Sequence, residues 1–255
     1  MKVWKMNLYK LTHKKSFVAA VLYIFFFIFV SASSYSSTIN SGDLDGWDIL
    51  RNFDLGKYVK IASTDILYQG TTLFSLMIFG ILLLNLYLED FNTGTYKYII
   101  ISGISKKSYY AQQLLFMVFI VLSFIVLSYC AVLGIGCCFW GTTGFSGKDF
   151  TETLYLYLVA AVPICTYLIW IFNIAMLVRN KWVSNFIAVL LPLLLGIVDS
   201  LTRTKLYSPF GLLCIFNQES PVDKIPHLAP YIIPELIWLF IGAVINFGVH
   251  KKYQN

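Results

Sequence analysis

The chain has 255 residues, of which 58% are hydrophobic and 13% are charged, whereas soluble domains contain roughly 45–50% and 25%. Together with a mean hydropathy of +0.72, this composition excludes a soluble globular enzyme and indicates a polytopic membrane protein. The net charge of +6 does not indicate a nucleic-acid-binding protein, because no segment is long and polar enough to form a water-soluble basic domain.

Residues 1–15 are predicted to form an amphipathic helix that lies in the inner headgroup layer before the first span. Apolar side chains at helical spacing share one face of this helix, while lysines and a histidine lie elsewhere. The apolar face consists of Met1, Trp4, Leu8 and Leu11. The alternative is an ordinary basic flank that only sets topology. No small-residue cleavage pattern follows, so we expect an anchored first span and not a signal peptide.

Stretches without charged residues predict six transmembrane helices, and hence an all-α fold in a single transmembrane domain. The predicted spans are about residues 16–37, 66–88, 108–133, 153–178, 182–198 and 230–249, the last interrupted only by Glu235. The charge-free run 108–147 is long enough for two helices. However, its glycines from Gly134 onward predict one span followed by an external loop.

Lysine and arginine concentrate in the segments on one side of this six-span layout, and the positive-inside rule places those segments and both termini in the cytoplasm. The low arginine content relative to lysine suggests an AT-rich bacterial genome. We therefore expect a multi-pass protein of the bacterial plasma membrane. The outer stretch 37–65 is acidic and polar, and we interpret it as a solvated loop or a surface that receives a cationic peptide.

No pattern predicts a catalytic residue, a metal site or a cofactor in this chain. The five cysteines and three histidines lack metal-ligand spacing, and a disulfide among the outer cysteines stays open. The stretch 141–150 approximates a phosphate-binding loop, but Gly141 and Gly147 are too far apart and Asp149 replaces the Ser or Thr that binds Mg²⁺. Energy for uphill transport would have to come from a partner or an ion gradient.

The stretch 89–107, between the second and third predicted spans, is the longest inner connection and has an apolar middle. It carries a glutamate, a Gly-Thr pair and a Ser-Lys pair, namely Glu89, Gly94, Thr95, Ser105 and Lys106. At these positions the sequence resembles the permease subunits of type-2 ABC exporters, which carry a Glu, a Gly-Thr pair and a Ser-Lys or Ser-Arg pair. The resemblance also covers the basic N-terminal helix and the six-span layout.

The sequence departs from the family pattern at two places. Gly103 stands where Pro is common, and Gln112 and Gln113 occupy a neighbourhood where a Lys often appears. The related exporters also place re-entrant helices before the last span, and the apolar stretch 208–216, too short to cross a membrane, resembles these.

The resemblance implies that residues 89–107 form a coupling helix that rests in a groove on a separate cytoplasmic ATPase. Two ATPase subunits would bind ATP and Mg, and a second permease copy or paralogue would complete the exporter. The cargo would be an amphipathic or antimicrobial peptide, as in peptide-toxin and bacteriocin exporters or immunity permeases. The coupling residues would be Glu89, Asp90, Phe91, Gly94, Thr95, Lys97, Ser105, Lys106 and Lys107. In that contact the charged residues would form a polar rim, and the anchors would be Phe91, Tyr96, Ile99, Ile100 and Ile101. The alternative is a solvated connector whose lysines only set topology.

Small polar side chains in the spans are candidates for the translocation path, which we expect between two permease copies. The candidates are Thr71, Thr72, Ser75, Asn85, Asn185 and Glu235. Polar side chains at membrane depth also pack helices together, and this explanation stays open. An ionisable group there is a functional candidate, so an ion-gradient-driven carrier or channel using Glu235 is the competing interpretation.

Overall fold

The computed structural model describes residues 2–41, 52–67, 70–178, 180–201, 207–209, 211–212 and 228–252. Within these ranges all regular secondary structure is helical, which confirms the all-α expectation. The helices are α1 (Lys2–Thr12), α2 (Lys15–Ser41), α3 (Leu55–Leu67), α4 (Gly70–Asn92), α5 (Thr95–Ile101), α6 (Lys106–Trp140), α7 (Gly147–Val178), α8 (Lys181–Leu201) and α10 (Ala229–Lys252).

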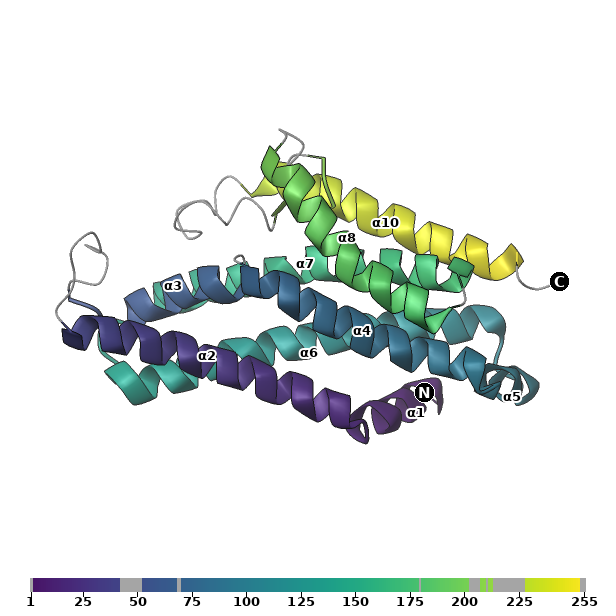
Figure 1. Cartoon of the computed structure of the whole chain (residues 1–255), viewed down its shortest axis with the longest axis horizontal. Coiled ribbons are helices and arrows are strands. Elements are labelled where there is room, and N and C mark those ends of the chain that lie inside the picture. Colours follow the sequence, from purple (N-terminus) through teal and green to yellow (C-terminus); the bar gives the residue numbers. More distant parts are fainter. Residues whose placement is uncertain are drawn as a thin grey trace.

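The long helices run roughly side by side along one axis of the molecule (Figure 1). Helices α1 and α5 and the last turns of α10 lie at one end, which we call the α5 end. Helix α3 lies at the other, the α3 end, where α6 meets α7. Helix α7 is central, because it packs against α3, α4, α6, α8 and α10.

Five helices are long and apolar enough to cross a membrane, namely α2, α6, α7, α8 and α10. The chain is therefore a multi-pass membrane protein. Helix α4 covers most of the second predicted span, and its 23 residues reach about 35 Å at 1.5 Å per residue, enough to cross the hydrocarbon core. The side chains of its first two turns lie outside the described ones, so six spans remains a proposal.

Burial follows the position of each helix in the bundle. Among these five helices, α7 buries the largest share of its membrane-spanning residues and α6 the next largest, whereas α2, α8 and α10 bury only a small share. Phe26 on α2, Phe186 on α8 and Phe240 on α10 are examples of exposed aromatic side chains. In a membrane these apolar faces contact lipid.

Helix α6 extends beyond the predicted end of the third span at residue 133 and continues to Trp140. The expectation that helical structure stops at Gly134 was wrong, because packing outweighs helix propensity here. A Cβ atom on Gly136 would lie 2.7 Å from atoms of both Leu55 and Tyr58. The glycine therefore lets α3 approach α6 closely. The helix ends at Gly141, whose φ of 67° is in the left-handed region.

The outer stretch 37–65, predicted as a loop, contains helix α3; residues 42–51 lie outside the described part. The Asp54 side chain accepts a hydrogen bond from the Lys57 backbone N–H at 2.8 Å and so caps the helix start. Leu55 and Val59 are buried on one face, and Lys60 pairs with Asp149 of α7 at 2.5 Å. The described polar residues Lys57 and Lys60 thus belong to an amphipathic helix docked on α6 and α7.

The N-terminal helix was predicted correctly, but its packed face differs from the predicted one. Val3, Asn7 and Leu11 are buried, and α1 packs against α6. Leu8, assigned to the apolar face, is exposed, whereas Trp4 contacts Phe116 edge to face with ring centroids 5.4 Å apart. The packed face of α1 is rotated relative to the predicted apolar face, because the polar side chain of Asn7 binds Gln113 inside the bundle.

Single cysteine probes should test the orientation of the bundle. In a background without native cysteines, a membrane-impermeant maleimide added to intact cells should label Lys148→Cys at the α3 end. It should leave Lys107→Cys and Lys181→Cys unlabelled until the membrane is permeabilised, because the positive-inside rule predicts that the lysine-rich α5 end faces the cytoplasm. Labelling of Lys181→Cys from outside would overturn the six-span layout.

Candidate functional site at the α5 end

The connection between α4 and α6 is shorter than the predicted loop because both helices extend into it. Helix α4 ends at Asn92, α5 occupies Thr95–Ile101 and α6 begins at Lys106. Gly94 adopts a left-handed φ of 72° at the first turn. The Ser105 hydroxyl accepts a hydrogen bond from the Ser108 N–H at 3.2 Å and caps α6. Two of the residues that carry the family resemblance therefore shape the turns around α5.

Two of the predicted coupling residues, Glu89 and Asp90, are paired with lysines of the N-terminal segment. Lys14 Nζ lies 2.5 Å from the Glu89 carboxylate, and Lys10 forms an ion pair with Asp90. The Asp90 side chain is fully buried, whereas that of Glu89 is 42% exposed. These carboxylates therefore bind α1 and its flank to the end of α4, which differs from the predicted polar rim around a partner.

Asp90 is the centre of a hydrogen-bond network that joins three helices. The Tyr109 hydroxyl of α6 donates to Asp90 at 2.8 Å. The Gln113 amide donates to the Tyr109 oxygen at 2.9 Å and accepts from Asn7 of α1 at 2.8 Å. We call this set, with Lys10, the Asp90 junction. Lys10, Asn7 and Tyr109 could not be recognised from the sequence, because their partners are remote along the chain. Gln113 stood out only as a departure from the family pattern.

Helix α5 is held to the bundle by aromatic side chains. Phe91 stacks on Tyr96 with ring centroids 4.7 Å apart, and Tyr96 contacts Tyr109 at 5.1 Å. The Tyr110 hydroxyl donates to the Tyr96 oxygen at 3.0 Å, and Ile99 is buried. Phe91, Tyr96 and Ile99, which we expected to anchor a partner, therefore face the protein's own core.

A different face of α5 points away from the bundle. Tyr98 is 73% exposed and Ile101 is 80% exposed, and their spacing of three residues places them on one side of the helix. Lys97, next to Tyr98 in the chain, and Lys107, at the start of α6, are exposed, while Lys106 and Thr95 are half-buried. We call Lys97, Tyr98, Ile101 and Lys107 the α5 outer face. Two large apolar side chains between lysines have the composition of a small docking surface.

The structure brings together only one pair of the candidate path residues. The Asn185 amide of α8 donates to the Asn85 oxygen of α4 at 3.4 Å, and both side chains are half-buried. The side chains of Thr71, Thr72 and Ser75 lie outside the described ones.

Glu235 is fully buried in α10, where it accepts a hydrogen bond from the Leu212 N–H at 3.0 Å. Ser208 and Leu212 are buried as well, and the Trp238 indole of α10 donates to the Tyr207 carbonyl at 2.7 Å. The described residues of the stretch 208–216 therefore contact α10 through Leu212 and Glu235.

Other polar side chains within the spans connect helices. Asn246 of α10 donates to Asn173 of α7 at 2.7 Å, and Asn173 donates to the Gly242 carbonyl at 2.9 Å. Among the described residues, no group of three His, Cys, Asp or Glu side chains lies together as a metal site would require. At the α5 end, the α5 outer face is one exposed surface that these contacts leave available.

Comparison with known proteins gives no support for a family assignment. No family model, no curated protein and no solved structure matches this chain. The likeness to type-2 ABC exporters therefore rests on the residues around α5 and on the layout of the helices.

Proposed function

We propose that the chain is the permease subunit of an ATP-driven type-2 ABC exporter in a bacterial plasma membrane. In this proposal it crosses the membrane six times, with both termini in the cytoplasm. Two permease subunits, identical or paralogous, assemble with two ATPase subunits that bind ATP and Mg. The cargo is an amphipathic or antimicrobial peptide that moves out of the cell or its membrane. The chain contributes no catalytic residue of its own.

The α5 outer face is the main observation behind the proposal. Tyr98 and Ile101 are more exposed than most apolar residues of the spans. Because α5 lies at the end of the bundle (Figure 1), their exposure differs from that of apolar side chains along the spans. Burying them in a groove on a partner would remove apolar area from water, which favours binding by about 1.5–3 kcal/mol for each side chain. Lys97 and Lys107 would form the polar rim of that contact.

The contacts behind the α5 outer face suit it to transmit movement. The ring stack of Phe91 and Tyr96 connects α5 to α4, and Tyr109 extends it to α6. The Asp90 junction adds α1 to the same unit. A displacement of α5 by ATP-driven closure of a partner would therefore shift the ends of several helices together. Side chains packed in this way transmit strain because interiors have low compressibility.

For the translocation path, the pair formed by Asn85 and Asn185 supports a polar lining between α4 and α8. The Asn185 oxygen has no hydrogen-bond partner among the described residues, so a polar group of a passing peptide would find an acceptor there. Thr71, Thr72 and Ser75 belong to the same α4 helix and would extend this lining. Helix packing alone remains the competing explanation for the pair.

An ion-gradient-driven carrier or channel is the second candidate, and the burial of Glu235 favours it. A carboxyl group held inside a membrane protein is a common proton site. No other carboxylate is fully buried in the described parts of the long helices except Asp90, and Asp90 is paired with Lys10. Carriers that move protons line the route with a chain of carboxylates, whereas Glu235 would be a single proton site.

The test measures ATP hydrolysis that co-purifies with the affinity-tagged full chain from its native membrane. Wild type should co-purify with a vanadate-sensitive ATPase. Tyr98→Ala combined with Ile101→Ala should lower the co-purified activity by about tenfold or more, because two side chains that the partner would bury are lost. Tyr207→Ala is a matched control, since its side chain is also 73% exposed but lies elsewhere, and it should retain wild-type activity.

The absence of ATPase activity with the wild-type chain, or equal activity with the double variant, would overturn the exporter assignment. Peptide-independent solute uptake into vesicles that contain only this chain, lost on Glu235→Gln, would support the carrier instead.

A further inference from the structure

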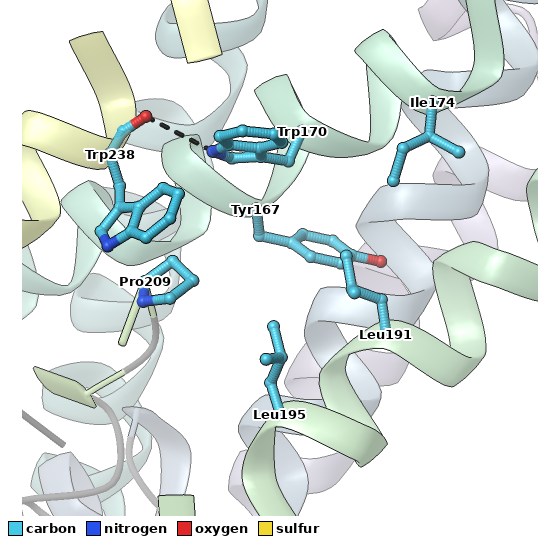
Figure 2. Close-up of a pocket in the computed structure, with 7 residues that line it drawn as sticks. All are labelled: Tyr167, Trp170, Ile174, Leu191, Leu195, Pro209 and Trp238. Carbon is cyan, nitrogen blue, oxygen red and sulfur yellow. Dashed lines mark hydrogen bonds between the residues drawn. The ribbon is translucent and has the colours of Figure 1, made fainter. Parts of the chain in front are cut away.

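A cavity of about 160 Å³ lies between α7, α8 and α10. Figure 2 shows that the rings of Tyr167, Trp170 and Trp238 surround it together with Pro209, while Leu191 and Leu195 of α8 close the opposite side. Ile174 of α7 completes the wall. The cavity is separate from the α5 end and from the pair formed by Asn85 and Asn185.

The polar atoms of the aromatic residues are already bound within the protein. Trp170 Nε1–H donates to the Trp238 carbonyl at 3.3 Å, and Trp238 Nε1–H donates to the Tyr207 carbonyl at 2.7 Å. The Tyr167 hydroxyl donates to the Ala188 carbonyl at 2.6 Å. The wall therefore presents ring faces and aliphatic carbons, and a water molecule inside would lack the two to four polar partners that it needs.

The cavity lies at the depth of the hydrocarbon core. At a rise of 1.5 Å per residue, Trp238 is about 14 Å along α10 from Ala229, and Trp170 is about 12 Å along α7 from Val178. Tryptophan usually lies at the membrane surface, where its N–H reaches water. Here the two indoles lie deeper, and their N–H groups are satisfied by carbonyls. Their position exposes flat apolar surface to the cavity.

The cavity also borders the lipid-facing surface of the bundle. Leu191 and Leu195 line it, and Leu190 and Leu194, their neighbours on α8, are exposed. On α10, Ile237 next to Trp238 is exposed as well. A void in the hydrocarbon core forfeits dispersion contacts on every atom of its wall. The nearest material that can restore those contacts is a lipid acyl chain.

We propose that this cavity binds the terminal segment of a membrane-lipid acyl chain. The ligand is a hydrocarbon chain, because the wall offers no polar or charged group and the neighbouring surface contacts lipid tails. The size agrees with this ligand, since an apolar cavity of about 150 Å³ accepts a benzene molecule. The bound chain would sit between α8 and the pair of α7 and α10, so the occupied site would support the contact between these helices.

The test is site-resolved photocrosslinking with the full chain in vesicles of phosphatidylcholine that carries a diazirine near the end of one acyl chain. Mass spectrometry should find label on the α7 peptide that contains Trp170 and Ile174. Leu195→Phe fills the cavity and should reduce this label by roughly threefold or more, because a packed site leaves no room for the chain. Leu194→Phe, on the exposed side of the same helix, should leave it unchanged.

Ile174→Phe fills the cavity from the opposite wall, so it should likewise reduce the label on the α8 peptide that contains Leu191 and Leu195. Gel filtration of each variant reports whether it is folded. Label confined to exposed residues such as Leu194, or equal label in the filled variants, would overturn the proposal. Displacement of the α7 label by an amphipathic cationic peptide at constant lipid would also overturn it, because the cavity would then be a peptide site.

Discussion

Lys10→Met should destabilise the folded chain by about 3 kcal/mol, because it leaves the buried Asp90 carboxylate without its cation. Asp90 is fully buried and keeps hydrogen bonds from Tyr109 and Gln113, but neutral donors do not replace the lost charge. The change should appear as a fall of roughly 6–12 °C in the thermal unfolding midpoint of the purified protein in a mild detergent.

Two further variants separate the buried pair from surface charge. Lys14→Met removes the lysine that pairs with Glu89, whose side chain is 42% exposed, so it should cost less than about 1 kcal/mol. Asp90→Asn in the Lys10→Met background removes both charges and should recover most of the loss. Equal effects of Lys10→Met and Lys14→Met would contradict a special role for the Asp90 junction.

Gly80→Ala should destabilise the chain by about 2–3 kcal/mol, because the new methyl group would overlap the Tyr167 hydroxyl. The Tyr167 ring has little freedom to move aside. Its hydroxyl donates to the Ala188 carbonyl at 2.6 Å, and Pro192, four residues later in α8, has no N–H to serve that carbonyl. The hydrogen bond therefore satisfies a backbone group that the proline leaves free inside the membrane.

Tyr167→Phe alone should cost about 1–2 kcal/mol, the value of a lost buried hydrogen bond. It should also reduce the effect of Gly80→Ala, because the remaining ring atoms lie 3.0 Å from the added methyl group. The stability loss of the double variant should then be smaller than the sum of the two single losses by about 1 kcal/mol or more. Chemical unfolding in detergent measures each term.

Gly134→Ala is the matched glycine control, since a Cβ there has no neighbour within 4 Å. It should be neutral or stabilising by up to about 1 kcal/mol through helix propensity. Additive losses for Gly80→Ala and Tyr167→Phe would show that the glycine does not serve this contact.

The membrane character and the N-terminal helix were predictable from the sequence because both depend on local composition and spacing. Charge-free runs identify α2, α6, α7, α8 and α10 without any knowledge of their packing. The end of α6 was not predictable in the same way. Gly136 reads as a helix breaker until Leu55 and Tyr58 of α3 are placed against it.

The orientation of α5 shows why the candidate site was predicted only in part. Its sequence is almost uniformly apolar, so a helix of seven residues gives no periodicity that separates a buried face from an exposed one. Tyr96 faces inward because Phe91 and Tyr110 contact it. Tyr98 faces outward because it lies two residues after Tyr96, and residues two apart point to nearly opposite sides of a helix. The partner of Asp90 was likewise hidden, since Lys10 is 80 residues away in sequence.

The Asp90 junction also orders events during biosynthesis. Lys10 needs a residue that is made 80 positions later, and Asn7 needs Gln113, which is made 106 positions later. At about 5–20 residues per second, Asn7 waits roughly 5–20 s for its partner to be synthesised. Until Asp90 is made, Lys10 has no ion-pair partner and its charge remains available to anionic phospholipids, whereas Asn7 waits longer for Gln113. Synthesis of α6, which carries Gln113, therefore completes the contacts that hold α1 in the bundle.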